Sequence, residues 1–296
     1  MQFLAYIIIY PILWIISILP FRLLYMLSDG VYVLLYYVIG YRKKVVKDNL
    51  KLVFPEKNEQ EIKQISKKFY HHFCDMMFEA IKSLTISEKQ ILRRFKITNI
   101  EEIKQYEKAN KSVIFLCGHY ASWEWAMSIQ KHINFTGYGV YKRLRNPYFD
   151  RLVKRVRGRY NSYLIDTKET ISTLVKSKEN GKLFLCGMVA DQSPKLTKAH
   201  HWTEFMGVKV PCYTGAELIT KRLNLPLLFL EIKKIKRGFY KATFSTITKT
   251  PKDFKDYELT DMFHKLVERQ IKKAPQFYLW THKRWKHKNN VPEKFQ

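Results

Sequence analysis

A histidine and a carboxylate lie close together after an apolar run, in the stretch GHYASWEWA (118–126). His119 comes two positions after the run VIFLC (113–117), and Glu124 follows five positions later. A neutral imidazole near pH 7 can take a proton from a hydroxyl. A carboxylate can hold the imidazole in one tautomer and stabilise the imidazolium that forms. The pattern therefore predicts that His119 is a general base with Glu124 as its partner, provided that His119 lies on a strand-to-helix turn.

Two other interpretations of this stretch stay open. His119 could cap the helix that follows, with Glu124 as a partner on the solvent side. Cys117 and His119 could form a nucleophile pair on one strand face, although the apolar run around Cys117 is typical of an inert thiol. In the general-base hypothesis, Trp123 and Trp125 would line an apolar mouth around the imidazole.

Several motifs of known enzyme chemistry are missing from the sequence. It contains no G-x-S-x-G, no P-loop and no G-x-G-x-x-G. The cysteines have no zinc-like spacing and are interpreted as reduced core thiols of a domain facing the cytosol. They are Cys74, Cys117, Cys186 and Cys212. The pair His71 and His72 does not by itself support a metal site, so we predict a reaction that needs neither a metal nor a cofactor.

From residue 111 onward, the sequence pattern alternates between strands and helices. The expected strands are 113–117, 138–142, 162–165, 183–190, 227–235 and 240–247. The expected helices are 121–132, 147–160, 168–179, 214–224 and 258–273. Such alternation is typical of an α/β fold with a largely parallel central sheet flanked by helices. Ligands of open sheets bind beyond the carboxyl ends of strands, which is where His119 is expected.

Helical signals also occur earlier in the chain. Residues 56–84 place apolar side chains near a period of 3.6, which predicts a long helix. Two capping-box patterns mark helix N-termini. They are Ser87 with Gln90, and Thr214 with Glu217.

The chain is strongly basic and rich in aromatic residues. Its 296 residues include 53 Lys and Arg against 26 Asp and Glu, a formal net charge of +27. This excess predicts an anionic partner, either nucleic acid, anionic lipid or an acidic protein. Aromatic residues suit nucleic acid and a membrane interface equally, so the N-terminal segment has to decide between them.

The N-terminal segment favours a membrane. Residues 3–19 form an uncharged apolar run at the short limit for spanning a bilayer core, and a cleaved signal peptide is not expected. Residues 23–40 are apolar but contain Asp29 and Gly30, which is typical of an interfacial or re-entrant segment. The basic run 40–51 marks the cytoplasmic side and binds anionic headgroups. A buried core helix is the alternative interpretation of the first apolar run.

These segments predict a division of the chain into three parts. Residues 1–40 would be a membrane anchor and interfacial helix, 41–110 a helical basic region, and 111–296 the α/β core, with 41–296 as one globular unit. The protein would lie at the bacterial inner membrane with its catalytic domain on the cytoplasmic face. The anchor, the basic run and the tail at 282–288 are expected near one membrane face.

Six blocks of the sequence resemble one family. H-x4-E is similar to the H-x4-[DE] signature of the glycerolipid and lysophospholipid acyltransferase superfamily. The chain resembles the late lipid A acyltransferases, the lauroyl and myristoyl transferases of the bacterial inner membrane. The matching blocks are RKKVVKDNLKLVFP (42–55), GHYASWEWA (118–126), YKRLRNPYFDRLVKRVRGR (141–159), VADQSP (189–194), FMGVKVPCYTGAELITKRLNLP (205–226) and APQFYLWTHKRWK (274–286). Lys142 and Arg143 replace the family's usual Arg-Pro, and KVPCY (209–213) replaces a double-Phe loop. Both departures are expected to alter the acceptor or the chain length.

The resemblance implies acyl transfer from acyl carrier protein or acyl-CoA to a hydroxyl of a lipid A precursor, with no nucleic acid as a partner. His119 would deprotonate the acceptor hydroxyl, which then attacks the thioester carbonyl. The oxyanion or the acceptor phosphates need positive or N–H donors. The expected source is one arginine cluster, with a solvated helix face as its alternative. The cluster is Arg155, Arg157 and Arg159.

Further site candidates come from the other blocks. Asp191 and Gln192 are expected at a strand end, where Asp191 could orient an arginine or cap a turn. Contacts with lipid headgroups are expected from four residues, which could otherwise be solvated. They are Tyr141, Asn146, His282 and Arg284.

Two alternative functions remain at this stage. The chain could acylate another lipid, such as a lysophospholipid or an aminolipid. It could also be a non-enzymatic basic protein that binds an anionic membrane or nucleic acid. The second alternative explains the net charge but gives no reason for a histidine at a strand end.

Overall fold

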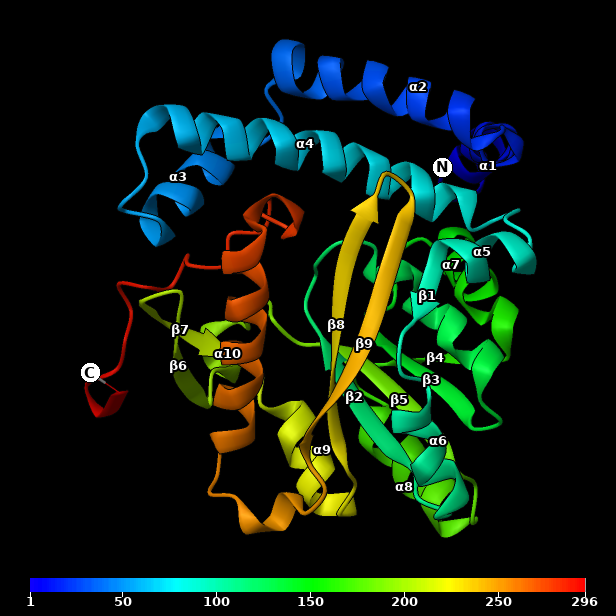
Figure 1. Cartoon of the computed structure of the whole chain (residues 1–296), viewed down its shortest axis with the longest axis vertical. Helices are drawn as coiled ribbons and strands as arrows, with labels where there is room; N and C mark the ends of the chain where they lie inside the picture. The colour runs from blue at the N-terminus through cyan, green and yellow to red at the C-terminus, as the bar shows by residue number, and fades with distance from the viewer. Residues whose placement is uncertain (296) are drawn as a thin grey trace.

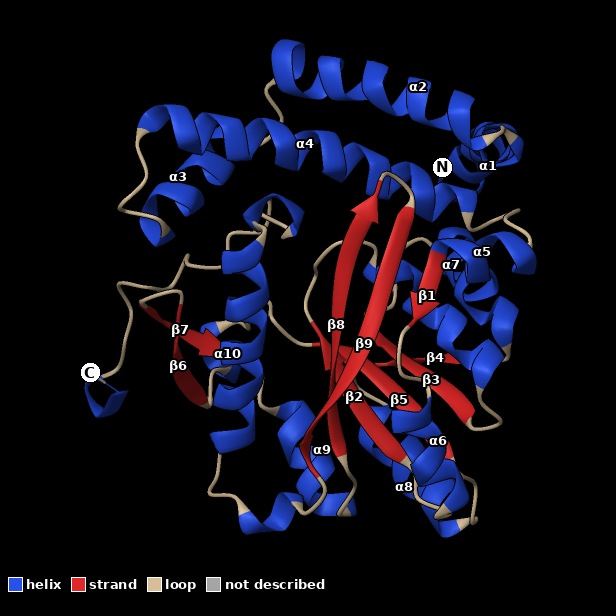
Figure 2. Cartoon of the chain, viewed as in Figure 1, coloured by secondary structure: helices blue, strands red, loops and turns tan. Residues whose placement is uncertain are grey.

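A seven-stranded sheet covered by helices forms the centre of the protein, as described for residues 1–295 in a computed structural model (Figure 2). The strands lie in the order β1-β9-β8-β2-β5-β3-β4. They are β1 (Phe95–Ile97), β2 (Val113–Cys117), β3 (Thr136–Tyr141), β4 (Ser162–Asp166), β5 (Phe184–Val189), β8 (Leu227–Lys236) and β9 (Phe239–Thr248). Neighbouring strands are parallel except for the antiparallel pair β8 and β9. The predicted α/β class with a largely parallel sheet is confirmed.

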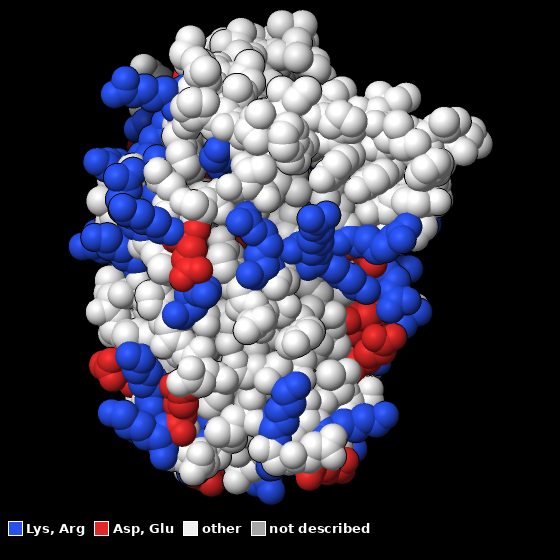
Figure 3. Space-filling view, turned by 90° about the vertical axis from the view of Figure 1, so that its right-hand side faces the viewer, with Lys and Arg blue, Asp and Glu red and all other residues white. Residues whose placement is uncertain are grey.

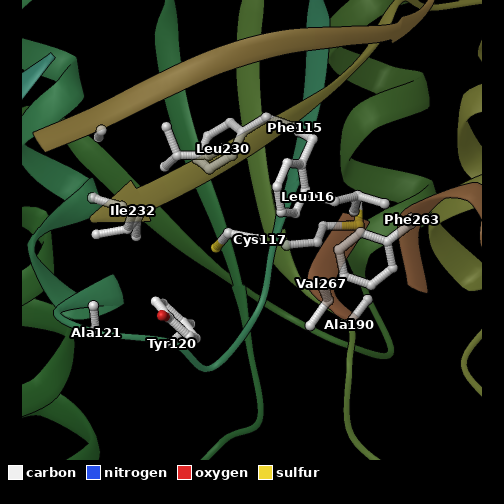
Figure 4. Packing of buried hydrophobic residues seen from close by; sticks show 14 of the residues in the cluster. Phe115, Leu116, Cys117, Tyr120, Ala121, Ala190, Leu230, Ile232, Phe263 and Val267 are labelled. Carbon is white, nitrogen blue, oxygen red and sulfur yellow. The ribbon is translucent and has the colours of Figure 1, made fainter. Parts of the chain in front are cut away.

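The central strands are buried on both faces, which is why they read as continuous apolar runs. All five residues of β2 are buried. Phe115 of this strand packs edge-on against Phe244 of β9, with ring centroids 5.6 Å apart. Leu116 and Leu230 belong, with Phe263 of α10 (Glu258–Lys273), to the same buried cluster (Figure 4). A Cβ on Gly187 of β5 would collide with the Phe115 ring, so the glycine makes room for the aromatic side chain.

Helices cover both the faces and one end of the sheet. They include α3 (Lys43–Val53), α4 (Glu59–Lys82), α5 (Glu88–Arg94), α6 (Glu101–Lys108), α7 (Pro147–Arg157), α8 (Thr170–Glu179) and α9 (Gly215–Leu223). The long helix α4 begins with a capping box between Asn58 and Glu61 and runs across the end of the sheet that the β8–β9 turn reaches (Figure 1). This end holds the carboxyl termini of β2 and β8, because the two strands are parallel.

Two apolar helices lie outside α4. They are α1 (Gln2–Ile18) and α2 (Phe21–Val33), which continues as a π-helical segment, Leu34–Ile39. The stretch Phe21–Ile39 is long and apolar enough to cross a bilayer, with a mean hydropathy of 1.3, whereas α1 is shorter. From the sequence we expect 3–19 as the anchor and 23–40 as an interfacial segment, and the length of Phe21–Ile39 makes it a second candidate for the span. Figure 3 shows an uncharged upper surface bordered below by a belt of Lys and Arg.

The basic run and the start of the C-terminal tail lie side by side in the fold. Arg42 Nη1 donates to the Thr281 carbonyl at 3.0 Å. Asn49 Nδ2 donates to the carbonyl of Trp280 at 2.9 Å and to that of His282 at 2.9 Å. These bonds hold α3 against the segment that follows α10.

Some local elements differ from the sequence-based expectation. The expected helix 121–132 is a 3-10 helix that begins only at Trp123 and ends at His132. Ser87 Oγ accepts from the Gln90 N–H at 3.3 Å, which confirms the cap of α5. Thr214 caps nothing with its side chain, and the predicted capping box is wrong there. Glu217 instead accepts the N–H groups of Tyr257 and Thr260, and so caps α10.

Candidate active site

His119 and Asp191 meet beyond the carboxyl ends of two neighbouring strands. Cys117, the last residue of β2, pairs in register with Val189, the last residue of β5. His119 and Asp191 each lie two residues further along, so the sheet register itself brings them together. His119 Nδ1 lies 2.6 Å from Asp191 Oδ1, and the His119 backbone N–H donates to the same oxygen at 3.1 Å.

Neighbouring segments fix the loop that carries His119. Ala121, which is fully buried, has a φ of +51°, a left-handed conformation that is uncommon for a residue with a Cβ. Its N–H donates to the Phe277 carbonyl at 2.9 Å. The Leu279 N–H donates to the His119 carbonyl at 3.1 Å. A backbone held in this way by tertiary contacts is typical of functional loops.

Asp191 is fully buried but stays ionised through its partner. Burial alone raises the pKa of its carboxyl, and the charge and hydrogen bonds of His119 outweigh burial, so the net pKa lies below the usual value. The His119 side chain remains 19% exposed. Trp123 packs edge-on against it, with ring centroids 5.1 Å apart. The imidazole thus has a buried anion on one side and partial access to solvent.

Glu124 pairs with an arginine rather than with the imidazole. Arg157 Nε donates to Glu124 Oε2 at 2.8 Å, and Arg157 Nη2 donates to Oε1 at 2.5 Å. This bidentate arrangement ties the 3-10 helix to the last turn of α7. We had expected Glu124 to hold the His119 tautomer and Asp191 to orient an arginine, and the structure exchanges these two contacts.

The three arginines of the expected cluster have different surroundings. Arg157 is held by Glu124, and Arg155 is exposed. Arg159 donates to the carbonyls of Ser83 at 2.7 Å and Ile86 at 2.9 Å, and so satisfies the carboxyl end of α4. The cluster is therefore neither one site nor simply a solvated helix face.

Among the expected headgroup contacts, Tyr141 and Asn146 make structural interactions. Tyr141 is buried, and its hydroxyl donates to Asp150 at 3.2 Å. Asn146 caps α7 by accepting the Tyr148 N–H at 3.0 Å, and its amide donates to the Gln2 carbonyl at 3.2 Å. Their side chains are thus engaged within the fold, contrary to the expectation of headgroup contacts.

The C-terminal candidates are also built into the fold. Arg284 is fully buried and donates to the Pro211 carbonyl at 2.9 Å, so it cannot reach a headgroup. His282 Nε2 accepts the Ser193 N–H at 3.3 Å. Burial and the nearby Arg284 lower the pKa of His282 to about 4, so it is neutral at pH 7 and offers no charge to a phosphate. Gln192, beside Asp191, is half-buried.

A buried carboxylate that the sequence analysis missed lies behind the His119 loop. Glu79 of α4 accepts hydrogen bonds from Tyr25 at 2.9 Å, Tyr240 at 2.9 Å and Ser122 at 3.1 Å. Trp125, expected at the mouth of the site, is buried instead, and its Nε1 donates to Ser83 Oγ at 3.1 Å. A sequence signal existed, because Glu79 falls on the apolar face of a helix with a 3.6 period.

The cysteine alternative is not supported by the surroundings of Cys117. All four cysteines are buried and unpaired by disulfides. Burial raises the pKa of the Cys117 thiol, and the carboxylates of Asp191 and Glu124 raise it further. A thiol in such a site stays protonated and is a poor nucleophile.

A second polar cluster joins α2, α4 and the β8–β9 turn. Asp29, His71 and Asp75 bring ligand-type atoms within 4.8 Å of one another. Arg237 already supplies both carboxylates with a cation: its Nη2 lies 2.5 Å from Asp29 Oδ1 and 2.6 Å from Asp75 Oδ1. We interpret this cluster as the ion-paired joint that holds α2 against the domain.

The chain is similar over most of its length to proteins of one enzyme family. The model of a bacterial lipid A biosynthesis acyltransferase family matches residues 1–287. The chain is 24% identical to the lipid A biosynthesis lauroyltransferase of Escherichia coli K12 over 289 residues, covering 96% of this chain and 92% of that protein. It is 19% identical to the palmitoleoyltransferase of the same strain over 280 residues, covering 93% and 89%. The acyltransferase of Haemophilus influenzae is 22% identical over 251 residues, covering 83% and 78%. The chain is therefore an enzyme of the bacterial lipid A biosynthesis acyltransferase family.

Proposed function

We propose that this protein transfers a fatty acyl chain from an acyl thioester, on acyl carrier protein or coenzyme A, to a hydroxyl of a lipid A precursor. The observation that carries this proposal is the 2.6 Å contact between His119 Nδ1 and Asp191 Oδ1 beyond the ends of β2 and β5. A carboxylate partner on Nδ1 favours the tautomer with the proton on that nitrogen. The other ring nitrogen, Nε2, is then free of a proton and able to act as a base.

In the proposed reaction, His119 Nε2 takes the proton of the acceptor hydroxyl while its oxygen attacks the thioester carbonyl. Asp191 stabilises the imidazolium that forms, because its carboxylate is already bound to the ring. The tetrahedral intermediate then collapses and breaks the carbon–sulfur bond. The imidazolium returns the proton to the departing thiolate, which leaves an ester and a free thiol.

Glu124 and Arg157 have a supporting role in this proposal. The bidentate pair uses the Nε–H and one Nη2–H of Arg157 and leaves other guanidinium N–H groups for an anionic ligand. These donors suit either the developing oxyanion or a phosphate of the acceptor. Glu124 would act by fixing the orientation of this guanidinium on α7.

We also propose that the apolar helices anchor the enzyme in the bacterial inner membrane, with its site on the cytoplasmic face. The exposed apolar surface of α1 and of Phe21–Ile39 supports this placement. The acceptor and the enzyme would then share one interface, and an acidic carrier protein would approach the basic domain from the aqueous side.

The decisive experiment compares the purified full-length wild type with His119→Ala and Asp191→Asn in detergent. Each enzyme receives a lipid A precursor and either acyl carrier protein or coenzyme A loaded with chains of different lengths, and products are identified by mass spectrometry. We expect an acylated lipid A precursor from the wild type and a large loss in both variants. Acylation of a lysophospholipid or an aminolipid alone would favour the other acceptor, and full activity of His119→Ala would refute the mechanism.

A further inference from the structure

A cationic pocket lies outside the His119 site, between α2, α4 and the β8–β9 turn. Its volume is about 480 Å³. Its lining includes five basic side chains and the single carboxylate of Asp75. The basic residues are Lys67, Lys68, Lys234, Lys236 and Arg237. Phe277 also lines the pocket, and its backbone carbonyl bonds to Ala121, so this segment separates the pocket from the His119 loop.

The carboxylate in this pocket is already neutralised. Arg237 Nη2 donates to Asp75 Oδ1 at 2.6 Å, and Lys234 Nζ donates to Oδ2 at 3.4 Å. Ser28 Oγ adds a hydrogen bond at 2.9 Å. Asp29, the other acidic residue nearby, is held by the same arginine at 2.5 Å. The acidic groups therefore have partners of their own and do not cancel the remaining lysines.

The remaining cations are not paired with protein carboxylates. Within residues 1–295, Lys67, Lys68 and Lys236 form no ion pair. Lys67 lies 5.8 Å from the centre of the Tyr37 ring, and Lys236 lies 4.7 Å from that of Phe239. Three like charges around one concave surface are unfavourable unless solvent or an anion compensates them. The pocket is thus built to accept negative charge.

Apolar groups border this pocket on the side of the proposed membrane. Tyr32 of the possible membrane span Phe21–Ile39 is part of its lining. Val33 and Leu34, next along this span, are 51% and 46% exposed, and Ile235, between the lysines of the β8–β9 turn, is 49% exposed. Lysines beside exposed apolar side chains are typical of the headgroup level of a bilayer.

We propose that this pocket binds the phosphate group of a membrane lipid, at a site distinct from the one that carries His119. Lys67, Lys68 and Lys236 would contact the phosphate, while the lipid chains lie along the exposed face of α2. A free phosphate shares this charge chemistry but cannot use the apolar border. A metal ion does not suit the pocket, because Asp75, the one carboxylate of its lining, already binds Arg237 and Lys234.

The test uses full-length protein in a non-ionic detergent and isothermal titration calorimetry. Dihexanoyl phosphatidic acid, kept below its micelle-forming concentration, is the probe, and inorganic phosphate is titrated separately. The pocket variant is Lys67→Gln, Lys68→Gln and Lys236→Gln combined. The matched control combines Lys108→Gln, Lys176→Gln and Lys252→Gln, three exposed lysines on other parts of the fold. All six positions are partly or fully solvent-exposed, and thermal melts confirm that both variants fold.

We expect saturable binding of the phosphatidic acid to the wild type, with a dissociation constant raised at least about tenfold in the pocket variant and changed less than about twofold in the control. Equal weakening in both variants, or no binding to the wild type, would overturn the proposal. Equal affinity for inorganic phosphate would assign the pocket to a free anion. If acyl carrier protein binds at this pocket and the phosphatidic acid does not, the pocket would be assigned to a protein contact and the proposal would be overturned. The assay involves no acyl transfer, so its outcome is independent of the role of His119.

Discussion

Two fully buried carboxylates, Glu79 and Asp191, lie on either side of the His119 loop. Their pKa values are shifted in opposite directions. Glu79 is enclosed by the hydroxyls of Tyr25, Tyr240 and Ser122. Asp191 accepts both the ring and the backbone N–H of one residue, His119. Burial raises the pKa of Glu79 to about 7, whereas the pKa of Asp191 lies below its usual value. Equal burial therefore gives opposite shifts, because one carboxyl faces neutral hydroxyls and the other an imidazole that can become charged.

This difference separates a carboxylate that is satisfied within the fold from the one that we propose takes part in catalysis. The hydroxyl donors around Glu79 join α2, α4, β9 and the His119 loop, and they are satisfied within the protein. The Asp191 carboxylate instead binds the imidazole of His119, and this ring remains partly exposed to solvent. Asp191 is fully buried, so it can act on a substrate only through the His119 ring. We therefore expect substitution of either residue to lower the activity.

The largest expected effect is on the imidazole itself. His119→Ala removes the proposed base, and we expect acyl transfer to fall by about 10²- to 10⁴-fold, as is usual when a general base is lost. Single-turnover measurements with saturating acyl donor isolate the chemical step. The variant should also melt at a lower temperature, because the fully buried Asp191 carboxylate loses its partner. Turnover is therefore compared below that temperature, and retained turnover would contradict the assignment.

Asp191→Asn should have the next largest effect on activity. An amide can donate to Nδ1 and so favour the tautomer with the proton on Nε2, which cannot act as a base. We expect a loss on the order of 10²-fold in turnover, with little change in the Michaelis constant. The double variant with His119→Ala should be no slower than His119→Ala alone, because the two residues act as one unit. Additive losses would show that Asp191 acts independently of the ring.

Glu124→Gln should have a smaller effect, through Arg157. A neutral amide accepts only one of the two guanidinium hydrogen bonds, so the arginine loses its fixed orientation. We expect roughly a tenfold loss of catalytic efficiency, and Arg157→Ala should behave similarly. Arg155→Ala, an exposed arginine on the same helix, is the matched control and should stay within about twofold. Equal losses in all three variants would indicate a general charge effect.

The smallest effect on activity, and a clear effect on stability, is expected at Glu79. Its folded pKa of about 7 exceeds the ordinary value of 4.5, so the folded state prefers the neutral carboxyl. The stabilisation is present in full below pH 4.5 and is lost as the pH rises through 7, by on the order of 3 kcal/mol. Glu79→Gln cannot ionise. Thermal melts between pH 5 and 8.5 should therefore show a decline in the wild type that is weaker in the variant, and identical pH profiles would contradict the shifted pKa.

The sequence alone indicated several features of the fold. Apolar runs bounded by turn residues located β2 and β5, because strands buried on both faces cannot carry polar side chains. Other elements could not be read in this way. The ribbon of β6 (His201–Phe205) and β7 (Val208–Cys212) turns at Met206 and Gly207, both with positive φ. Methionine is a poor signal for such a turn, which usually carries Asn or Gly.

What the sequence by itself determined is that His119 lies beyond a buried strand and that Asp191 follows another. Only the tertiary structure decided which carboxylate the imidazole meets. The pairing of β2 with β5 is a long-range contact, and nothing local in either strand specifies its neighbour. The 3-10 helix starting at Trp123 then turns Glu124 toward Arg157 of α7. The short separation of His119 and Glu124 along the chain suggested that they form a pair. The order of the strands instead brings His119 into contact with Asp191, 72 positions away, because the ends of adjacent parallel strands lie side by side.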